Sequence, residues 1–297
     1  MTGATTERNV AVEHALLRLR ELPPLPLAIR ELSATLSNDR ANYAAIAQAL
    51  NRDPPLTARI LGLANSAYYG MAGRVHSVQD AVRVLGLTLV RGVAMGMCLM
   101  EPLDTRRCAN FRPRDYWLSS LLTALAAQRL SPLVNAGTAA SSTISEDFAY
   151  LGGLLHRIGI IALVFLRPDV MEPLLGPRGR DDTPLSSLEE RYLQMNHRQA
   201  GAWLLWRWRL PGPLPHVAAH YAERGYRGED WGLCALVGLA SRWADGILAG
   251  DSETPWDDTT LAALGIAPRL ANHLRDELAP TAESLRETAR EMAEHGA

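Results

Sequence analysis

The sequence predicts an all-α protein, built as a multi-helix bundle with a smaller helical subdomain at its N-terminus. Three observations support this fold class. Apolar residues recur at spacings of three and four along most segments, helix-start signals are frequent, and the alternating pattern typical of strands is almost absent. The chain has 297 residues, of which 47% are hydrophobic, so it can bury a sizeable core in one large domain or two small ones.

The helix-start signals follow one another along the chain. Asp53 is suited to cap a helix that has proline in its first turn and runs through Ile60. Ser77 opens a capping-box-like start, and Ser145, followed by two acidic residues, is suited to cap the helix that carries Leu151. Proline-rich breaks separate the predicted helices at Pro23–Pro26, around Pro102, at Pro173–Pro184 and at Pro211–Pro215.

The chain is expected to have four parts. We expect an N-terminal helix or tail over residues 1–21 and an N-terminal helical part over residues 22–100. The main helical bundle is expected over residues 101–250, and closing C-terminal helices over residues 251–297. The sequence leaves open whether the closing helices pack on the bundle or form a homodimer contact.

Composition excludes several classes of protein. The formal net charge is −2 and no basic run dominates, so a dedicated nucleic-acid binder is disfavoured. All 30 basic side chains are arginine, which excludes a lysine Schiff base and a P-loop lysine. Cys98, Cys108 and Cys234 lack metal-site spacing and are expected to be reduced thiols. The N-terminus lacks an apolar signal core and the richest apolar stretch, Ile158–Leu166, is too short to span a membrane, so we expect a cytoplasmic protein without a membrane segment.

A dense set of motifs lies in the N-terminal third of the chain. In order, they are Leu22-Pro23-Pro24-Leu25-Pro26, Arg52-Asp53-Pro54, Leu63-Ala64-Asn65-Ser66-Ala67-Tyr68-Tyr69-Gly70 and Ser77-Val78-Gln79-Asp80. This order resembles the HDOD domain, a bacterial signalling module related to the HD and HD-GYP metal-dependent phosphohydrolases. The resemblance extends from Leu22 to about Asp245, and it implies an HD-like helical bundle.

The same resemblance identifies the positions where an HD enzyme would hold its metal: a His on one helix, an adjacent His-Asp pair and a distal Asp. In the string Leu154-Leu155-His156-Arg157-Ile158-Gly159 the histidine is present, but Arg157 occupies the place of the Asp. A guanidinium is always cationic and has no lone pair to donate, so it repels the ion that a carboxylate attracts. Ser119 stands at the first ligand position and Ser241 at the distal one. The resemblance therefore implies a degenerate active site, without catalytic residues, resident metal or cofactor.

Two further histidines, His197 and His220, lie in contexts that match the family. With His156, they are expected to be partly buried structural residues. The alternative is that the three imidazoles meet in space and bind Zn²⁺ adventitiously.

Arg157 needs an anionic partner if it points inward, because a buried guanidinium is costly when unpaired. Asp245 and Glu190 are the candidates, and the sequence does not choose between them. The functional alternative is that the old cleft binds an anionic ligand, such as a nucleotide, through Arg157 and the histidines.

Two other motifs are read as structural. The stretch from Ala44 to Asn65 resembles a helix-turn-helix motif. If it bound DNA, Thr57, Arg59 and Asn65 would contact bases in the major groove. An ordinary helical hairpin is favoured, because no basic patch accompanies the motif.

A tryptophan cluster lies further along the chain. Trp203 and Trp206 are three residues apart and are expected to pack in the core. The sequence does not indicate whether Trp208 is buried or exposed. An exposed tryptophan would instead mark a partner interface.

We therefore expect a non-catalytic module of bacterial signal transduction. It would act through an unidentified signalling protein or through an anionic ligand in the degenerate cleft. The alternatives are a residual phosphohydrolase acting on a nucleotide or cyclic dinucleotide, and a DNA-binding regulator.

Overall fold

The structure is a computed structural model. It describes residues 19–24, 34, 48, 50, 53–65, 73–135, 144–177, 183–210, 212–250 and 258–294. Every regular element in these ranges is a helix and none is a strand, which confirms the all-α prediction. Most of the tail expected over residues 1–21, and residues 66–70 of the N-terminal motif string, lie outside the described residues.

The described N-terminal helices are α4 (Pro54–Ala64), α5 (Val78–Leu85) and α6 (Leu87–Met100). Two of them begin at the predicted caps. Asp53 Oδ1 accepts a hydrogen bond from the backbone N–H of Leu56 at 3.0 Å. Ser77 Oγ accepts one from the backbone N–H of Asp80 at 3.1 Å. Gly86 has a φ of 81°, so the chain turns from α5 into α6 at a residue that tolerates the left-handed region.

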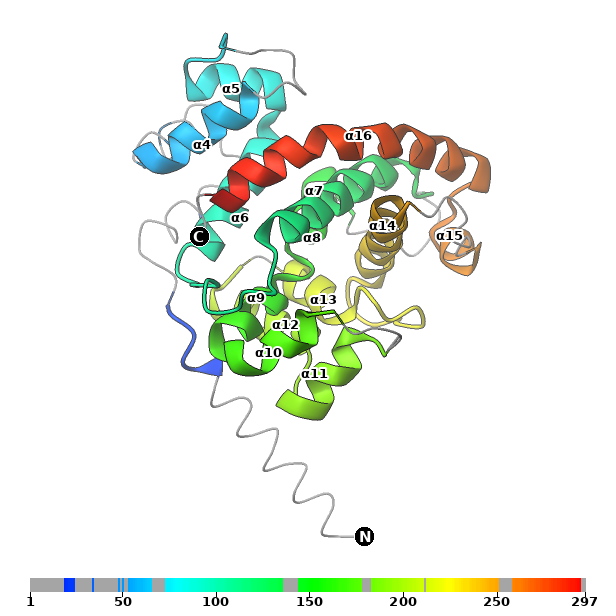
Figure 1. The fold of residues 1–297 in the computed structure, drawn as a ribbon. Helices are drawn as coiled ribbons and strands as arrows, with labels where there is room; N and C mark the ends of the chain where they lie inside the picture. The colour runs from blue at the N-terminus through cyan, green and yellow to red at the C-terminus, as the bar shows by residue number, and fades with distance from the viewer. Residues whose placement is uncertain are drawn as a thin grey trace.

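The centre of the molecule is built around α7. The helices of this part are α7 (Pro113–Leu130), the short 3-10 helix η2 (Ser131–Leu133), α8 (Glu146–Leu155), α14 (Trp231–Ala249), α15 (Asp258–Leu264) and α16 (Pro268–Glu294). α7 packs against α8, α14 and α16. Figure 1 shows α16 lying along α7, and its contact with α4 brings the C-terminal helix onto the N-terminal helices.

Shorter helices fill the lower part of Figure 1: α9 (Ile158–Leu166), α10 (Pro168–Leu175), α11 (Leu185–Leu193), α12 (His197–Arg207) and α13 (Pro213–His220). Asn196 caps α12 through a capping box with Gln199. The backbones of α9 and α12 approach so closely that a Cβ added at Gly159 would lie 1.8 Å from the carbonyl oxygen of His197. Only glycine fits there, so this contact holds the start of α12 beside the junction of α8 and α9.

One apolar core joins these parts. Trp208 is buried, and its indole N–H donates to the backbone oxygen of Pro23 at 3.2 Å, which ties the N-terminal segment to the end of α12. α6 and α14 end close to the boundaries predicted at 100 and 250. The shared core shows that the N-terminal part packs on the main bundle, while the division into four parts stays a prediction.

Length and composition alone would let two helical stretches, Glu146–Leu166 and Trp231–Ala249, cross a membrane. A bent pair, Val78–Leu85 with Leu89–Met100, would be a third if it counted as one span. From the sequence, Ile158–Leu166 alone was judged too short to span a membrane. This is corrected here, because α8 and α9 follow one another almost without a break and together form a longer apolar stretch. The apolar windows of the first two stretches are 78% and 61% buried inside the protein, so their side chains pack the core.

The tryptophan prediction is wrong at one position. Trp206 is 70% exposed on α12, although its spacing from Trp203 predicted a shared buried face. Trp203 is half-buried, and the guanidinium of Arg207 lies over its ring at 5.1 Å. Leu204 and Leu205 supply the buried face of this helix turn instead.

Candidate functional site

Helices α7, α8, α9 and α14 converge on one cleft. They bring together Ser119 from α7, His156 and Arg157 from the α8–α9 junction, and Ser241 and Asp245 from α14. His156 is the last residue of the α8 turn and Arg157 is the N-cap of α9. The fold therefore brings Ser119, His156, Arg157 and Ser241 side by side.

His156 is buried and its two ring nitrogens are both occupied. Nδ1 lies 2.7 Å from the carbonyl oxygen of Gly153, and Nε2 lies 3.1 Å from Ser241 Oγ. Because a carbonyl only accepts, Nδ1 carries the proton, and Nε2 accepts a hydrogen bond from the Ser241 hydroxyl. Burial, and after it the positive charge of Arg157, hold the pKa of His156 well below its usual range. The imidazole is neutral, and its one lone pair is engaged by a hydroxyl.

Arg157 pairs with Asp245, one of its two predicted partners. Its Nη1 lies 2.9 Å from Asp245 Oδ1 and its Nη2 lies 2.5 Å from Asp245 Oδ2, a bidentate arrangement. Nη1 also donates to Ser119 Oγ at 3.2 Å, and Nη2 to Ser241 Oγ at 3.1 Å. The other candidate, Glu190, accepts a hydrogen bond from the Asn196 side chain instead.

The Arg157 side chain is 23% exposed and that of Asp245 is 47% exposed. The pair therefore lies at the mouth of the cleft and not in its depth. The guanidinium donates to the hydroxyls of Ser119 and Ser241, so one cation links α7 and α14 across the cleft.

A second network surrounds His197. Glu189 is fully buried, and its Oε2 accepts from the backbone N–H of His197 at 2.8 Å and lies 2.6 Å from His197 Nδ1. His197 Nε2 lies 3.1 Å from the hydroxyl of Tyr221. Glu189 Oε1 is buried without a hydrogen-bond partner in the described part of the chain. His197 thus has a buried carboxylate beside it, where His156 has a guanidinium.

Tyr221 connects the two histidines. Its ring stands edge-on to His156 with the ring centroids 4.7 Å apart, and its hydroxyl contacts His197. Burial raises the pKa of Tyr221, although the positive charge of Arg157 opposes this, so the phenol keeps its proton. Sequence reasoning missed both Tyr221 and Glu189. The one available signal was general: a buried histidine needs partners for both ring nitrogens.

His220 does not join the other histidines. Its Nδ1 lies 3.1 Å from Glu223, and its ring stacks on Tyr226 with centroids 3.9 Å apart. The alternative in which three imidazoles meet is therefore wrong for His220, because that side chain faces the loop after α13. Only His156 and His197 lie on the two sides of Tyr221.

A cavity of about 280 Å³ opens beside the substituted positions. It is lined by Ser119 and Arg157 together with Asn110, Arg112, Tyr116 and Ile160, among others. Its volume suits a small molecule, and its lining combines two guanidinium groups and the carboxylate of Asp115 with aromatic and apolar surface.

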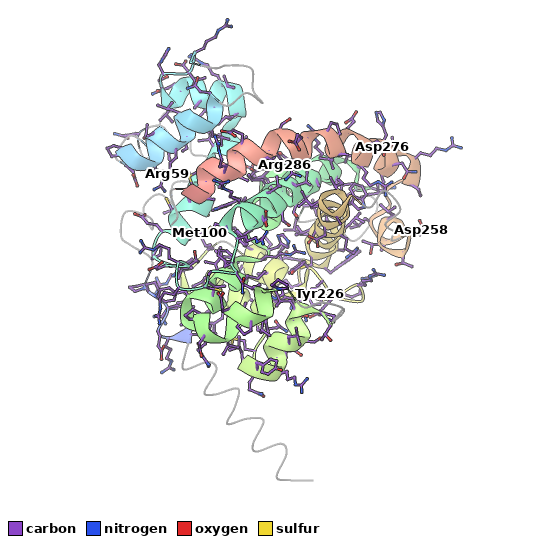
Figure 2. The ribbon with its side chains drawn as sticks, in the orientation of Figure 1. Arg59, Met100, Tyr226, Asp258, Asp276 and Arg286 are labelled. Atoms are coloured by element: carbon purple, nitrogen blue, oxygen red, sulfur yellow. The ribbon has the colours of Figure 1, made fainter. Side chains whose placement is uncertain are left out.

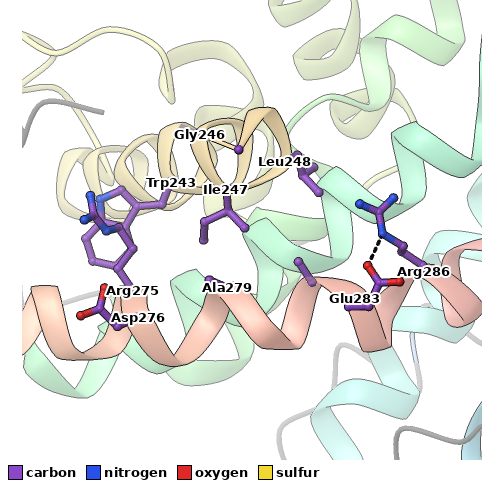
Figure 3. A pocket seen from close by; sticks show the side chains of 11 residues that line it. Trp243, Gly246, Ile247, Leu248, Arg275, Asp276, Ala279, Glu283 and Arg286 are labelled. Carbon is purple, nitrogen blue, oxygen red and sulfur yellow. Dashed lines mark hydrogen bonds and ion pairs between the residues drawn. The ribbon is translucent and has the colours of Figure 1, made fainter. Parts of the chain in front are cut away.

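A slightly larger cavity, about 310 Å³, lies between α14 and α16. Figure 3 shows Trp243 and Ile247 from α14 facing Arg275 and Ala279 from α16 across it. Arg286 at one end forms an ion pair with Glu283. None of the predicted site residues lines this cavity, so the smaller cleft is the better candidate site.

The helix-turn-helix residues that are described serve the fold. Thr57 Oγ1 donates to the backbone oxygen of Leu50 at 2.8 Å. The Asn65 amide donates to the backbone oxygens of Leu61 and Val75, and its oxygen accepts from the backbone N–H of Val75. Side chains committed in this way are poor readers of base edges.

Comparison with known proteins identifies relatives across most of the chain. Residues 22–223 match the model of the HDOD domain family. A protein of Marinobacter aquaeolei VT8, provisionally named a signal transduction protein, is 25% identical with a TM-score of 0.82, and the match covers 97% of this chain and 66% of that one. A provisionally named phosphohydrolase of Shewanella amazonensis SB2B is 23% identical with a TM-score of 0.72, covering 95% of this chain and 98% of that one, which shows a shared fold.

An uncharacterized protein of Treponema pallidum (strain Nichols) is 24% identical over 248 residues, which is 81% of this chain and 45% of that protein. The chain therefore spans less than half of this relative and just under two thirds of the Marinobacter protein. The family match confirms the resemblance that the N-terminal motifs suggested.

Proposed function

Because this chain belongs to the HDOD domain family, we propose that it is a signal-transduction module whose metal cleft serves as a structural network and not as a hydrolytic centre. The family match and the signal transduction protein of Marinobacter aquaeolei both support a signalling-related role. The absence of hydrolysis is argued from the cleft itself.

The observation that carries the proposal is the place of Arg157. Metal-assisted hydrolysis needs lone pairs and negative charge converging on one point, where the ion lowers the pKa of a bound water. Here a permanent cation bonds to both substituted hydroxyls, and its charge is matched by the carboxylate of Asp245. The lone pair of His156 Nε2 accepts from Ser241. A divalent ion in this position would meet a guanidinium and neutral hydroxyls, and the carboxylate beside them is already paired with Arg157.

An anionic ligand is a weaker candidate for the same cleft. Both terminal nitrogens of Arg157 already donate to Asp245 and to a serine. A phosphate would have to displace the Asp245 carboxylate. The net free energy of binding would then be only the difference between two similar bidentate pairs with Arg157. Protein contact is therefore the favoured mode of action.

Trp206 is the best candidate for that contact. It is 70% exposed on α12, and large aromatic side chains dominate the energetics of protein interfaces. Tyr192, near the end of α11, is 56% exposed and adds a second aromatic surface.

A hydrolysis assay tests the first half of the proposal. Purified full-length chain is incubated with a generic phosphodiester and with a cyclic dinucleotide in the presence of Mn²⁺, Fe²⁺ or Mg²⁺. We expect no turnover by the wild type, by His156→Ala or by Arg157→Asp, since serines still occupy the two other ligand positions. Turnover by the wild type that disappears in His156→Ala would reverse the proposal.

Protein contact is tested with matched surface variants. Cross-linked partners of the wild-type chain are identified from its native cells, and their binding to purified chain is measured. Trp206→Ala should weaken binding by more than roughly tenfold, as for a hot-spot aromatic. Leu270→Ala, which removes another exposed apolar side chain, from α16, should leave it unchanged. Equal binding by all three chains would exclude α12 as the interface.

A further inference from the structure

A second group of metal-ligating side chains lies outside the cleft, where α13 and α14 are joined by a loop. His216 projects from α13, and Glu229 and Asp230 end the loop. One donor atom from each of the three lies within 4.8 Å of the other two, and His216 Nδ1 is 2.8 Å from Asp230 Oδ2. Tyr226, labelled in Figure 2, lies in the same loop.

Asp230 adopts a conformation that serves this group and not the helix it begins. It is the N-cap of α14, yet its side chain makes no capping hydrogen bond, and its backbone is left-handed with φ 55° and ψ 22°. Asp53, Ser145 and Asn196 each cap their helices through the side chain. The Asp230 side chain is only 10% exposed, and its carboxylate is turned to His216 instead.

Glu229 supplies the third donor. No hydrogen bond or ion pair engages its side chain within the described part of the chain, and the residue is exposed, so the carboxylate is free to turn.

We infer that His216, Glu229 and Asp230 form a Zn²⁺ site. One imidazole nitrogen and two carboxylate oxygens are ligands that zinc accepts, and three protein ligands leave a position for water. In a tetrahedral site with bonds of about 2.05 Å, ligand atoms lie roughly 3.3 Å apart. To reach this geometry, the His216–Asp230 distance of 2.8 Å would have to lengthen slightly, and the side chain of the exposed Glu229 would have to turn toward the ion.

The bound ion would close the loop of residues 221–229 by tying α13 to the start of α14. That loop begins at Tyr221, which contacts both His156 and His197. Zinc would therefore hold the segment that covers the two histidine networks, and its release would loosen it. The site is independent of the proposed function, because it shares no residue with the cleft.

Titration of the full-length, chelator-treated chain with ZnCl₂ by calorimetry tests the inference, with Co²⁺ absorption as a second readout. The wild type should bind one Zn²⁺. Glu229→Gln is the decisive variant, since an exposed side chain without a partner can change without harm to the fold. It should weaken binding by more than roughly tenfold, as should His216→Ala.

Two controls separate the competing explanations. His273→Ala removes an exposed histidine that pairs with Glu277 on α16, and His156→Ala removes a cleft histidine; both should bind zinc like the wild type. The inference is overturned if the wild type binds no zinc, or if Glu229→Gln binds as tightly as the wild type, which would leave an ordinary His–Asp ion pair. Loss of zinc in His156→Ala alone would also overturn it and would place the metal in the cleft.

Discussion

His156 and His197 lie on opposite sides of Tyr221, and they have opposite electrostatic neighbours. His156 has a guanidinium beside it and a hydroxyl on its lone pair, so it stays neutral. His197 has a fully buried carboxylate on one nitrogen and a phenol on the other. The same side chain is thus used in two ways in one cleft. At His156 the protein suppresses a charge, and at His197 it supplies a buried acidic partner.

Of the two histidine networks, the larger loss of stability is expected on the His197 side. Glu189→Leu keeps the volume of the side chain but leaves the backbone N–H and the ring Nδ1 of His197 without their acceptor. Two unsatisfied buried groups should lower the free energy of unfolding by about 3 kcal/mol. Urea denaturation of the wild type and the variant measures this. Glu190→Leu, next in the chain and bonded to the Asn196 side chain, should cost clearly less; equal costs would contradict the assignment.

On the His156 side the corresponding change is Arg157→Ala. It strands the Asp245 carboxylate and removes the donors to Ser119 and Ser241. Because Asp245 is 47% exposed, water can replace part of the pairing, and the cost should be about 2 kcal/mol, below the value for a fully buried pair. Arg83→Ala, which removes an exposed helical pair with Asp80, should cost less than about 0.5 kcal/mol. If Arg157→Ala melts like Arg83→Ala, the guanidinium does not organise the cleft.

A pH titration of stability sharpens the comparison. The pKa of His156 is lowered in the folded state, so the unfolded chain, in which the imidazole has its ordinary pKa of 6.5, takes up the proton first. Stability from this group is therefore complete above about pH 6.5 and falls as the pH drops below it, by at most about 1.4 kcal/mol per pH unit. His156→Gln should show a flatter dependence between pH 7.5 and 5.5 than the wild type. His273→Gln, exposed on α16, serves as the control, and an unchanged slope in His156→Gln would exclude a buried neutral imidazole.

The smallest effect is expected at the surface. Trp206→Ala should change the free energy of unfolding by no more than about 0.5 kcal/mol, because the ring is mostly in water. Trp208→Ala, which removes a buried ring and its hydrogen bond to Pro23, should cost about 3 kcal/mol or more. Thermal melts of both variants check this, and similar losses would mean that Trp206 packs in the core after all.

Local sequence signals predicted what depends on local chemistry. Asp53, Ser77 and Ser145 cap the helices expected of them, because a capping bond spans only three residues. The family resemblance located Ser119, Arg157 and Ser241 in one cleft. Because a buried guanidinium needs an acceptor, two acidic residues were proposed as the partner of Arg157, and Asp245 is the correct one.

The features that the sequence did not predict depend on how the helices are rotated and packed against one another. A short stretch of sequence does not determine that arrangement. Trp206 has the spacing of a core residue, but the rotation of α12 is set by Gly159 and the capping box at Asn196. The partners of His197 come from α11 and from the end of α13, so they could not be paired before those helices were placed. For the same reason His220, one residue before Tyr221, could not be excluded from the cleft.

The Arg157–Asp245 pair also bears on whether single substitutions could create a metal site in the cleft. A carboxylate introduced at position 157 alone would leave Asp245 without its cation, and Ser119 and Ser241 would lose their donor. The loss of this ion pair and of its hydrogen bonds would lower stability before any ion could bind. If imidazole or carboxylate ligands were introduced at positions 119 and 241 first, they would lie beside the Arg157 guanidinium, which repels a metal ion. Each single-step path thus passes through a less favourable intermediate, so under the proposed function the ion pair opposes the gain of a metal site.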